Sequence, residues 1–185
     1  MLVMHQNKEL NTNTRYLHDS IVDYAQNLTR TLPDELEVCY FTNSGSESND
    51  LALRIARLYN DSYESIVLSG AYHGHTSSLI DISPYKFLGS GGKGKPDFVH
   101  LIPMPDMYRG EHKMADAKPE EYYIDLVNKT ITKIEKKGKR LAFFIVEPIM
   151  GCGGQIIVPP SFMTEAFKIV KKAGGLCIVD EVQIG

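Results

Sequence analysis

Several polar residues of this sequence stand directly after short apolar runs, where a binding site can form. Asp180 follows the apolar run 176–179, and a carboxylate at the end of a buried strand is costly unless it is paired. Gly45 and Ser46 stand where a strand-like run leads into a helix, so free backbone N–H groups and the positive helix end offer a site for an anion. Tyr72 precedes a glycine turn, and its ring could stack on a flat aromatic ligand. These residues favour a ligand that has both an anionic group and a protonated aromatic ring.

Pyridoxal phosphate is a ligand of this kind. The carboxylate of Asp180 would keep the ring nitrogen protonated, which makes the ring an effective electron sink. If the strand continues, Val182 lies on the same side as Asp180 and could pack on the ring, and Gln183 could hydrogen-bond the phenolic oxygen. A simpler interpretation stays open for the anion site, because Ser46 with Asn49 could be no more than helix capping.

The elements that would position these residues alternate between strands and helices. Strands are expected near 37–42, 65–69, 98–102, 141–147 and 175–180. Helices are expected over 15–31, from Ser46 onwards with Leu51, Ile55 and Leu58 on one face, over 119–137 and over 161–173. This alternation predicts an α/β fold with a mostly parallel sheet covered by helices. Ligands of such sheets bind beyond the carboxyl ends of the strands, so Gly45, Tyr72 and Asp180 should meet at one edge.

Composition excludes several other classes of protein. The chain has 185 residues, 43% of them hydrophobic and 23% charged, which is typical of an ordinary globular protein. A net charge of -3 does not provide the excess of positive charge that is typical of nucleic-acid-binding proteins. No apolar run approaches the roughly 20 residues of a membrane span. Three scattered cysteines favour neither a disulfide framework nor a metal cluster. A cytoplasmic protein without a metal, nucleic acid or membrane partner is expected.

A nucleotide site is the alternative from another class of enzyme. The segment "GSGGKGKP" over 89–96 has the spacing of a P-loop, and "IVDE" over 178–181 resembles a Walker B strand. However, Pro96 stands where a hydroxyl would hold magnesium, and no buried strand precedes the loop. The P-loop NTPase is therefore an unfavoured alternative, as is a metal pair in "HGH", which has no third ligand.

Four separated segments together resemble one known family. The segments "NSGSESND", "AYHGHT", "EPIMGCGGQIIVPP" and "IVDEVQIG" are similar, in this order, to the class III pyridoxal-phosphate-dependent aminotransferases. The resemblance implies the large domain of a fold type I enzyme, a homodimer, and Gly45 and Ser46 at the cofactor phosphate. It places Glu147 near the substrate. The implied cofactor-binding residues are Gly45, Ser46, Tyr72, His73, Glu147, Asp180, Val182 and Gln183.

Further segments are most similar to one branch of this family. The runs "LNTNTRYLHDSIVDYA", "LIDISPYKF" and "GCGGQIIVPP" resemble the branch that includes phospho-lyases of phosphoethanolamine and phosphohydroxylysine. Many class III members carry arginine after "HG" to bind a substrate carboxylate, and His75 stands there instead; histidine is the poorer carboxylate clamp. The favoured function is an aminotransferase acting on a primary amine, and the alternative is a phospho-lyase.

The resemblance also bears on what the chain contains. In the family, the lysine that forms the Schiff base with the cofactor follows the "DEVQ" segment, and no lysine of this sequence stands at that place. The expectation is a partial large domain over 1–185, without the N-terminal segment, the lysine segment and the C-terminal small domain. Such a chain alone is expected to be inactive.

Overall fold

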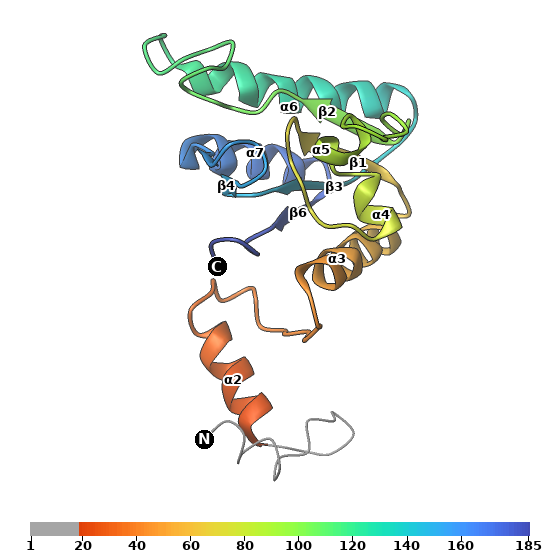
Figure 1. The fold of residues 1–185 in the computed structure, drawn as a ribbon, viewed down its shortest axis with the longest axis vertical. Helices are drawn as coiled ribbons and strands as arrows, with labels where there is room; N and C mark the ends of the chain where they lie inside the picture. Colours follow the sequence, from red (N-terminus) through yellow and green to blue (C-terminus); the bar gives the residue numbers. More distant parts are fainter. Residues whose placement is uncertain (1–18) are drawn as a thin grey trace. The chain divides into compact units, whose positions relative to one another are not determined.

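Figure 1 shows the computed structural model, which describes residues 19–185. The chain falls into two compact units that divide between Phe41 and Thr42. In the first unit, helix α2 (Asp19–Thr29) lies within the helix predicted over 15–31. Residues 15–18 of that prediction lie outside the described residues, and over the observed span the prediction is confirmed.

The strand predicted over 37–42 is not formed, so this prediction is wrong. The run has no regular secondary structure, and Val38 and Tyr40 are 76% and 69% exposed. Within this unit the run contacts α2, where the rings of Phe41 and Tyr24 lie 5.6 Å apart. A strand needs a neighbouring strand for its backbone N–H and C=O groups, and the described part of this unit holds only α2.

The second unit contains the predicted parallel sheet. Its four strands are β1 (Glu64–Leu68), β2 (Val99–Ile102), β3 (Leu141–Val146) and β6 (Leu176–Val179). Their order is β2-β1-β3-β6, and every neighbouring pair is parallel. Every side chain of β1 and β3 is buried, as expected for central strands covered on both faces. The α/β prediction is confirmed, and all four carboxyl ends lie at one edge.

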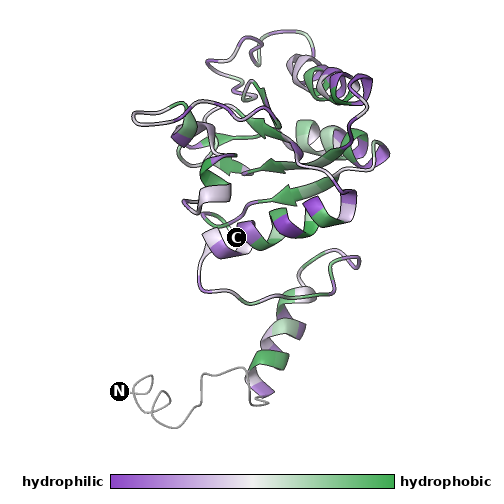
Figure 2. Ribbon diagram, turned by 90° about the vertical axis from the view of Figure 1, so that its right-hand side faces the viewer, coloured by the Kyte–Doolittle hydropathy of each residue, from purple (hydrophilic) through white to green (hydrophobic). Residues whose placement is uncertain are grey.

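Helices cover the two faces of this sheet. The long helices are α3 (Gly45–Asn60), α6 (Pro119–Lys136) and α7 (Pro160–Lys172), and the short ones are α4 (Ser77–Ile80) and α5 (Pro84–Phe87). Side chains of α6 and α7 form one hydrophobic core with the sheet, and those of α3, α4 and α5 form another on the opposite face. Figure 2 shows the hydrophobic strands between these helices. A small antiparallel hairpin, β4 (Ile149–Met150) with β5 (Ile156–Ile157), follows β3 and was not predicted.

The buried face of α3 differs from the predicted one. The prediction placed Leu51, Ile55 and Leu58 on one face, but Ile55 and Leu58 are 44% and 75% exposed. The buried residues of α3 are instead Asn49, Leu53 and Ala56. The helix therefore turns a polar side chain towards the sheet, which hydrophobic spacing alone could not indicate.

The glycine-rich segment over 89–96 is not a P-loop. It follows helix α5 rather than a strand, and β2 begins after it at Val99. A P-loop requires the order strand, loop, helix, so the NTPase alternative is excluded by the topology. No helix in the described part of the chain is long and apolar enough to cross a membrane.

Candidate functional site

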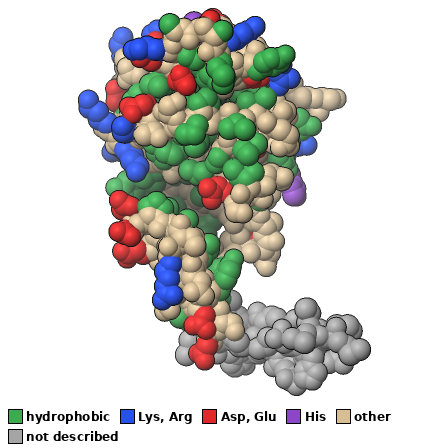
Figure 3. All heavy atoms as spheres, turned by 90° about the vertical axis from the view of Figure 1, so that its left-hand side faces the viewer, with side chains coloured by type: hydrophobic (Ala, Val, Ile, Leu, Met, Phe, Trp, Pro, Cys, Tyr) green, Lys and Arg blue, Asp and Glu red, His purple; other side chains and the backbone are tan. Residues whose placement is uncertain are grey.

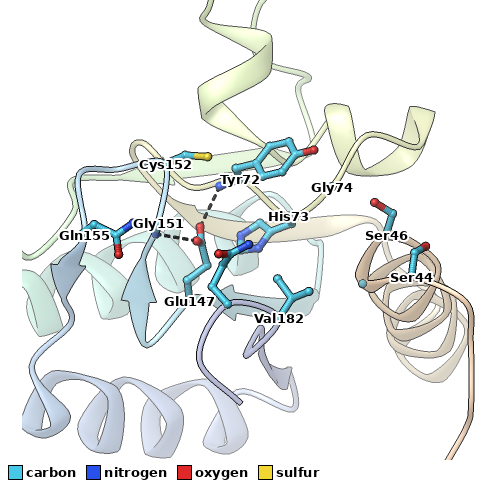
Figure 4. A pocket seen from close by; sticks show the side chains of 12 residues that line it. Ser44, Ser46, Tyr72, His73, Gly74, Glu147, Gly151, Cys152, Gln155 and Val182 are labelled. Carbon is cyan, nitrogen blue, oxygen red and sulfur yellow. Dashed lines mark hydrogen bonds between the residues drawn. The ribbon is translucent and has the colours of Figure 1, made fainter. Parts of the chain in front are cut away.

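A cavity of about 410 Å³ lies where the strands end, within the second unit (Figure 4). The prediction that the separated segments meet at one edge of the sheet is confirmed. Among the residues lining the cavity are Gly45, Ser46, Tyr72, His73, Glu147, Val182 and Gln183. Asp180 does not line the cavity but lies behind it, bonded to His73 and Val182. Figure 4 shows Ser44 and Ser46 on one side of the cavity and Tyr72 with Cys152 on the other.

The first turn of α3 lies where the sequence predicts an anion site. Ser44 is the N-cap, and its Oγ accepts a hydrogen bond of 3.1 Å from the N–H of Glu47. Glu47 in turn accepts from the N–H of Asn43 over 2.6 Å. The N–H groups of Gly45 and Ser46 have no acceptor among the described residues, so they remain available to an anion. The helix is thus capped by Ser44, and the capping interpretation of Ser46 is wrong.

Asp180 is held by a buried hydrogen-bond network. Its side-chain oxygen Oδ2 accepts from Asn49 Nδ2 over 2.8 Å and lies 2.9 Å from His73 Nδ1. Because a carboxylate at this site only accepts, Nδ1 is the protonated nitrogen of the His73 ring. Among the described residues, the other oxygen, Oδ1, accepts only a long bond of 3.3 Å, from the N–H of Val182. Asp180 is 5% exposed, so this oxygen is a buried acceptor with spare capacity.

The same network joins α3 to the segment that follows β1. Asn49 Nδ2 also donates to the backbone oxygen of His73 over 2.9 Å, which explains why this polar side chain of α3 is buried. His73 is 2% exposed, and its Nε2 atom has no hydrogen-bond partner among the described residues. An unpaired buried nitrogen beside a cavity indicates a ligand-binding role for this part of the chain.

The chain after β6 does not continue as a strand. The prediction placed Val182 on the same side as Asp180 on the condition that the strand continued, and this condition is not met. Strand β6 ends at Val179, and residues 182–184 form a turn that begins with the bond from Val182 N–H to Asp180. Val182 nevertheless lines the cavity. A Cβ atom on Gly45 would lie 2.4 Å from Val182 Cγ2, so glycine is needed there for Val182 to pack against α3.

Glu147 fixes the opposite wall of the cavity. One of its side-chain oxygens accepts from the N–H of Tyr72 over 2.9 Å, and the other accepts from the N–H of Gly151 over 3.0 Å. The carboxylate is 4% exposed and holds together the loops after β1 and β3. Its role in the described geometry is therefore to position Tyr72 and the loop that carries Gly151.

Sequence reasoning missed several residues of the cavity, namely Ser44, Gly74, Gly151, Cys152 and Gln155. The sequence signal for Gly74 is the glycine itself, between two histidines. The structure shows why glycine is needed, because a Cβ there would lie 2.6 Å from Ser46 Oγ. Its φ of +131° also requires glycine. His75, which replaces the expected arginine, is exposed and does not line the cavity; its N–H donates to Ser46 Oγ over 3.4 Å.

Comparisons with known proteins identify the family of this chain. Residues 2–185 match the sequence model of the family Aminotransferase class-III. The chain is 46% identical over 179 residues to "Alanine--glyoxylate aminotransferase 2-like" of Drosophila melanogaster, covering 95% of this chain and 36% of that protein. It is 38% identical over 182 residues to "Ethanolamine-phosphate phospho-lyase homolog 1" of Caenorhabditis elegans, covering 94% and 39%.

Solved structures show the same fold. A phospholyase from Arthrobacter in complex with phosphoethanolamine matches with a TM-score of 0.85 and 31% identity, over 99% of this chain and 42% of that chain. An amine transaminase from an uncultivated Pseudomonas species, in its pyridoxal-phosphate-bound form, matches with a TM-score of 0.82. Its identity of 22% supports the fold alone. The chain spans less than half the length of these relatives. It belongs to the class III aminotransferases, enzymes of the fold type I class whose cofactor is pyridoxal phosphate.

Proposed function

We propose that an enzyme of the relatives' full length carrying this sequence is a class III aminotransferase that acts on a primary amine. The observation that carries the proposal is the buried Oδ1 atom of Asp180, which has spare accepting capacity beside a cavity that is lined by the unpaired N–H groups of Gly45 and Ser46. The site thus offers an acceptor for a cation or N–H donor and N–H donors for an anion. Pyridoxal phosphate carries both groups.

The cavity suits this cofactor in size and chemistry. Its volume of about 410 Å³ lies within the roughly 300–1,000 Å³ of small-molecule sites. Gly45 and Ser46 would bind the phosphate through their N–H groups, and Asp180 Oδ1 would accept from the protonated ring nitrogen. Tyr72 and Val182 would enclose the ring, and Gln183, which also lines the cavity, would donate to a ring oxygen. These assignments, with His73 and Glu147 as positioning residues of the site, are part of the proposal.

When bound, pyridoxal phosphate supplies an electron sink for breaking a C–H bond beside the amine nitrogen. The chain's own contribution is electrostatic preorganisation, because Asp180 is fixed before any ligand arrives. Asn49 and His73 hold its Oδ2 atom, so Oδ1 keeps one direction. Glu147 holds Tyr72 in place through its backbone N–H.

The variant Asp180→Asn tests the proposal in the full-length enzyme. Asparagine keeps a hydrogen-bonding oxygen but loses the charge, so turnover should fall at least about 100-fold while most of the cofactor stays bound. Turnover and the absorbance of bound cofactor are measured on the same preparation. Asp106→Asn is the matched control, since Asp106 is an aspartate of similar burial, 6% exposed, that does not line the cavity. Normal turnover of Asp180→Asn with bound cofactor would contradict the assignment.

A phospho-lyase is the second candidate, favoured by His75 and by the relatives. His75 leaves the cavity without the arginine that commonly clamps a carboxylate. The name of the Caenorhabditis elegans relative and the ligand of the Arthrobacter structure both concern phosphoethanolamine. Incubation with phosphoethanolamine should release inorganic phosphate and ammonia if this candidate is right. Formation of an amino acid from an added keto acid, without phosphate release, would instead support transamination.

The assembly and the compartment also belong to the proposal. Residues 1–185 are proposed as part of the cofactor-binding large domain of a homodimer. Ile55, Leu58 and Tyr59 of α3 are exposed, which supports a partner surface on this helix. Figure 3, which views the other side of the molecule from α3, shows further hydrophobic side chains gathered on the surface of residues 42–185. Light scattering of the full-length enzyme tests the dimer.

The proposed compartment is the cytoplasm. A human relative carries the word mitochondrial in its name, so imaging of the tagged full-length enzyme is the test.

A further inference from the structure

The cavity has no cationic side chain of its own. None of the residues that line it is Lys or Arg, and Glu147 contributes an acid. The unpaired N–H groups of Gly45 and Ser46 are assigned to the cofactor phosphate under the proposed function. An amine substrate that also carries an anionic group therefore needs another cation near the cavity, because an unpaired anion beside Glu147 would be repelled.

Lys86 is a cation placed beside a lining residue of this cavity. It lies in α5, and its Nζ atom is 5.5 Å from the ring centroid of Tyr72 and 5.5 Å from that of Tyr85. The two rings pack edge to face, with centroids 6.1 Å apart. Aromatic faces hold an ammonium group without neutralising its charge. No carboxylate in the described part of the chain forms an ion pair with Lys86, so its charge stays available.

Cys152 is a lining residue of the cavity whose thiol pKa depends on the charge of Lys86. The thiol lines the cavity near Tyr72 (Figure 4). Burial raises the pKa of the Cys152 thiol above its ordinary value, the charge of Glu147 raises that pKa further, and the charge of Lys86 acts in the opposite direction. This effect on the pKa of Cys152 is consistent with the position of Lys86 Nζ, 5.5 Å from the ring centroid of Tyr72.

We propose that Lys86 is a specificity residue whose ammonium group binds the anionic group of the amine substrate at the Tyr72 side of the cavity. The proposal rests on the proposed function. The anion is a phosphate in a phospho-lyase substrate and a carboxylate in an amino acid; both are recognised by a point charge with three rotatable donors. The neighbouring tyrosine rings fix the ammonium position and leave its hydrogens free for the substrate.

The first experiment measures kcat and KM of the full-length holoenzyme with phosphoethanolamine, β-alanine and the neutral propylamine. Lys86→Met should raise KM for the anionic amine that the enzyme uses by about 10- to 100-fold, the worth of one charge-assisted hydrogen bond. The value of kcat and the KM for propylamine should stay within about twofold, because they need no anion site. Lys86→Arg should recover most of the loss. Phosphoethanolamine and β-alanine distinguish the two kinds of anion.

Lys93→Met is the matched control. Lys93 and Lys86 line the same neighbouring cavity of about 380 Å³ beside α5, but Lys93 makes no ring contact with Tyr72 among the described residues. Its removal subtracts the same charge from the same region. If Lys93→Met raises KM as much as Lys86→Met does, or if Lys86→Met leaves KM unchanged, the proposal is wrong.

A second experiment does not depend on activity. Cys152 is alkylated in the same full-length enzyme with anionic iodoacetate or neutral iodoacetamide, and mass spectrometry reads the modification at this one site. Both reagents need the same thiolate, so the ratio of their rates reports the local charge. Lys86→Met should lower this ratio by about threefold or more, and Lys93→Met should leave it nearly unchanged. An enzyme without turnover would refute the proposed function, whereas an unchanged ratio in Lys86→Met would refute the role of Lys86.

Discussion

The variant Asn49→Ala tests how the buried network is held together. Asn49 donates one hydrogen bond to the carboxylate of Asp180 and one to the backbone oxygen of His73. Alanine removes both donors but leaves both acceptors buried. Asp180 keeps its bonds from the His73 ring and from the N–H of Val182. The carboxylate therefore loses one hydrogen bond but is not left without a partner.

The expected loss follows from these two bonds. A bond to a neutral carbonyl is worth about 1 kcal/mol and one to a carboxylate about 1.5–3 kcal/mol, so the free energy of unfolding should fall by about 3 kcal/mol. For a protein of this size, 1 kcal/mol corresponds to roughly 2–4 °C in Tm. Asn49→Ala should therefore lower Tm by about 6–12 °C.

Asn60→Ala is a matched control on the same helix. Asn60 also donates through Nδ2 from α3 to the sheet, but it makes a single bond of 3.0 Å to the backbone oxygen of Ala142. Its loss should cost about 1 kcal/mol, or roughly 2–4 °C. The two variants are compared by thermal unfolding of the purified protein at one pH and one concentration. Equal shifts in Tm would refute the reasoning, because they would mean that the contact with Asp180 adds nothing to stability.

Two further predictions concern packing and pH. Gly45→Ala should lower the free energy of unfolding by about 1–3 kcal/mol, because its methyl group would lie 2.4 Å from Val182 Cγ2; adding Val182→Ala should recover most of this loss in urea unfolding, and failure to recover would contradict the packing argument. Burial alone would raise the pKa of the buried Glu64 carboxyl, but hydrogen bonds from Lys139 and His100 outweigh it, so the pKa lies below its ordinary value of 4.5. Glu64 then stabilises the fold fully above about pH 4.5, and this stability is lost as pH falls through the lowered pKa. In urea unfolding at several pH values, the stability advantage of the native protein over Glu64→Gln should shrink below pH 4.5; a constant advantage would contradict it.

The sheet and its long helices were predictable because their patterns are local. The run over 141–146 is a continuous apolar stretch, and it forms the central strand β3. The run over 37–42 looks similar in the sequence but forms no strand, since strand formation depends on a neighbour that local sequence does not reveal. The difference between the two runs lies in what surrounds each segment.

The site was predictable at the strand ends and less so between them. Asp180, Tyr72 and Gly45 carry local signals, and the fold brings their segments together as expected. The role of Asn49 was missed because its partner Asp180 is 131 residues away in the chain, and a polar residue in the first turns of a helix is typical of a cap. Likewise, nothing near Lys86 in the sequence indicates that its ammonium group lies over the ring of Tyr72.

The strand order has a consequence for synthesis on the ribosome. Strand β1 is central, and it pairs with β2 on one side and with β3 on the other. Strand β3 begins at Leu141, after both β2 and the long helix α6 have been made. At roughly 5–20 residues per second, the 72 residues between β1 and β3 (69–140) take about 4–14 s to translate. During this interval one edge of a strand that is fully buried in the folded protein has no partner, so the nascent chain should bind a chaperone most strongly after β1 emerges and should release it once β3 follows.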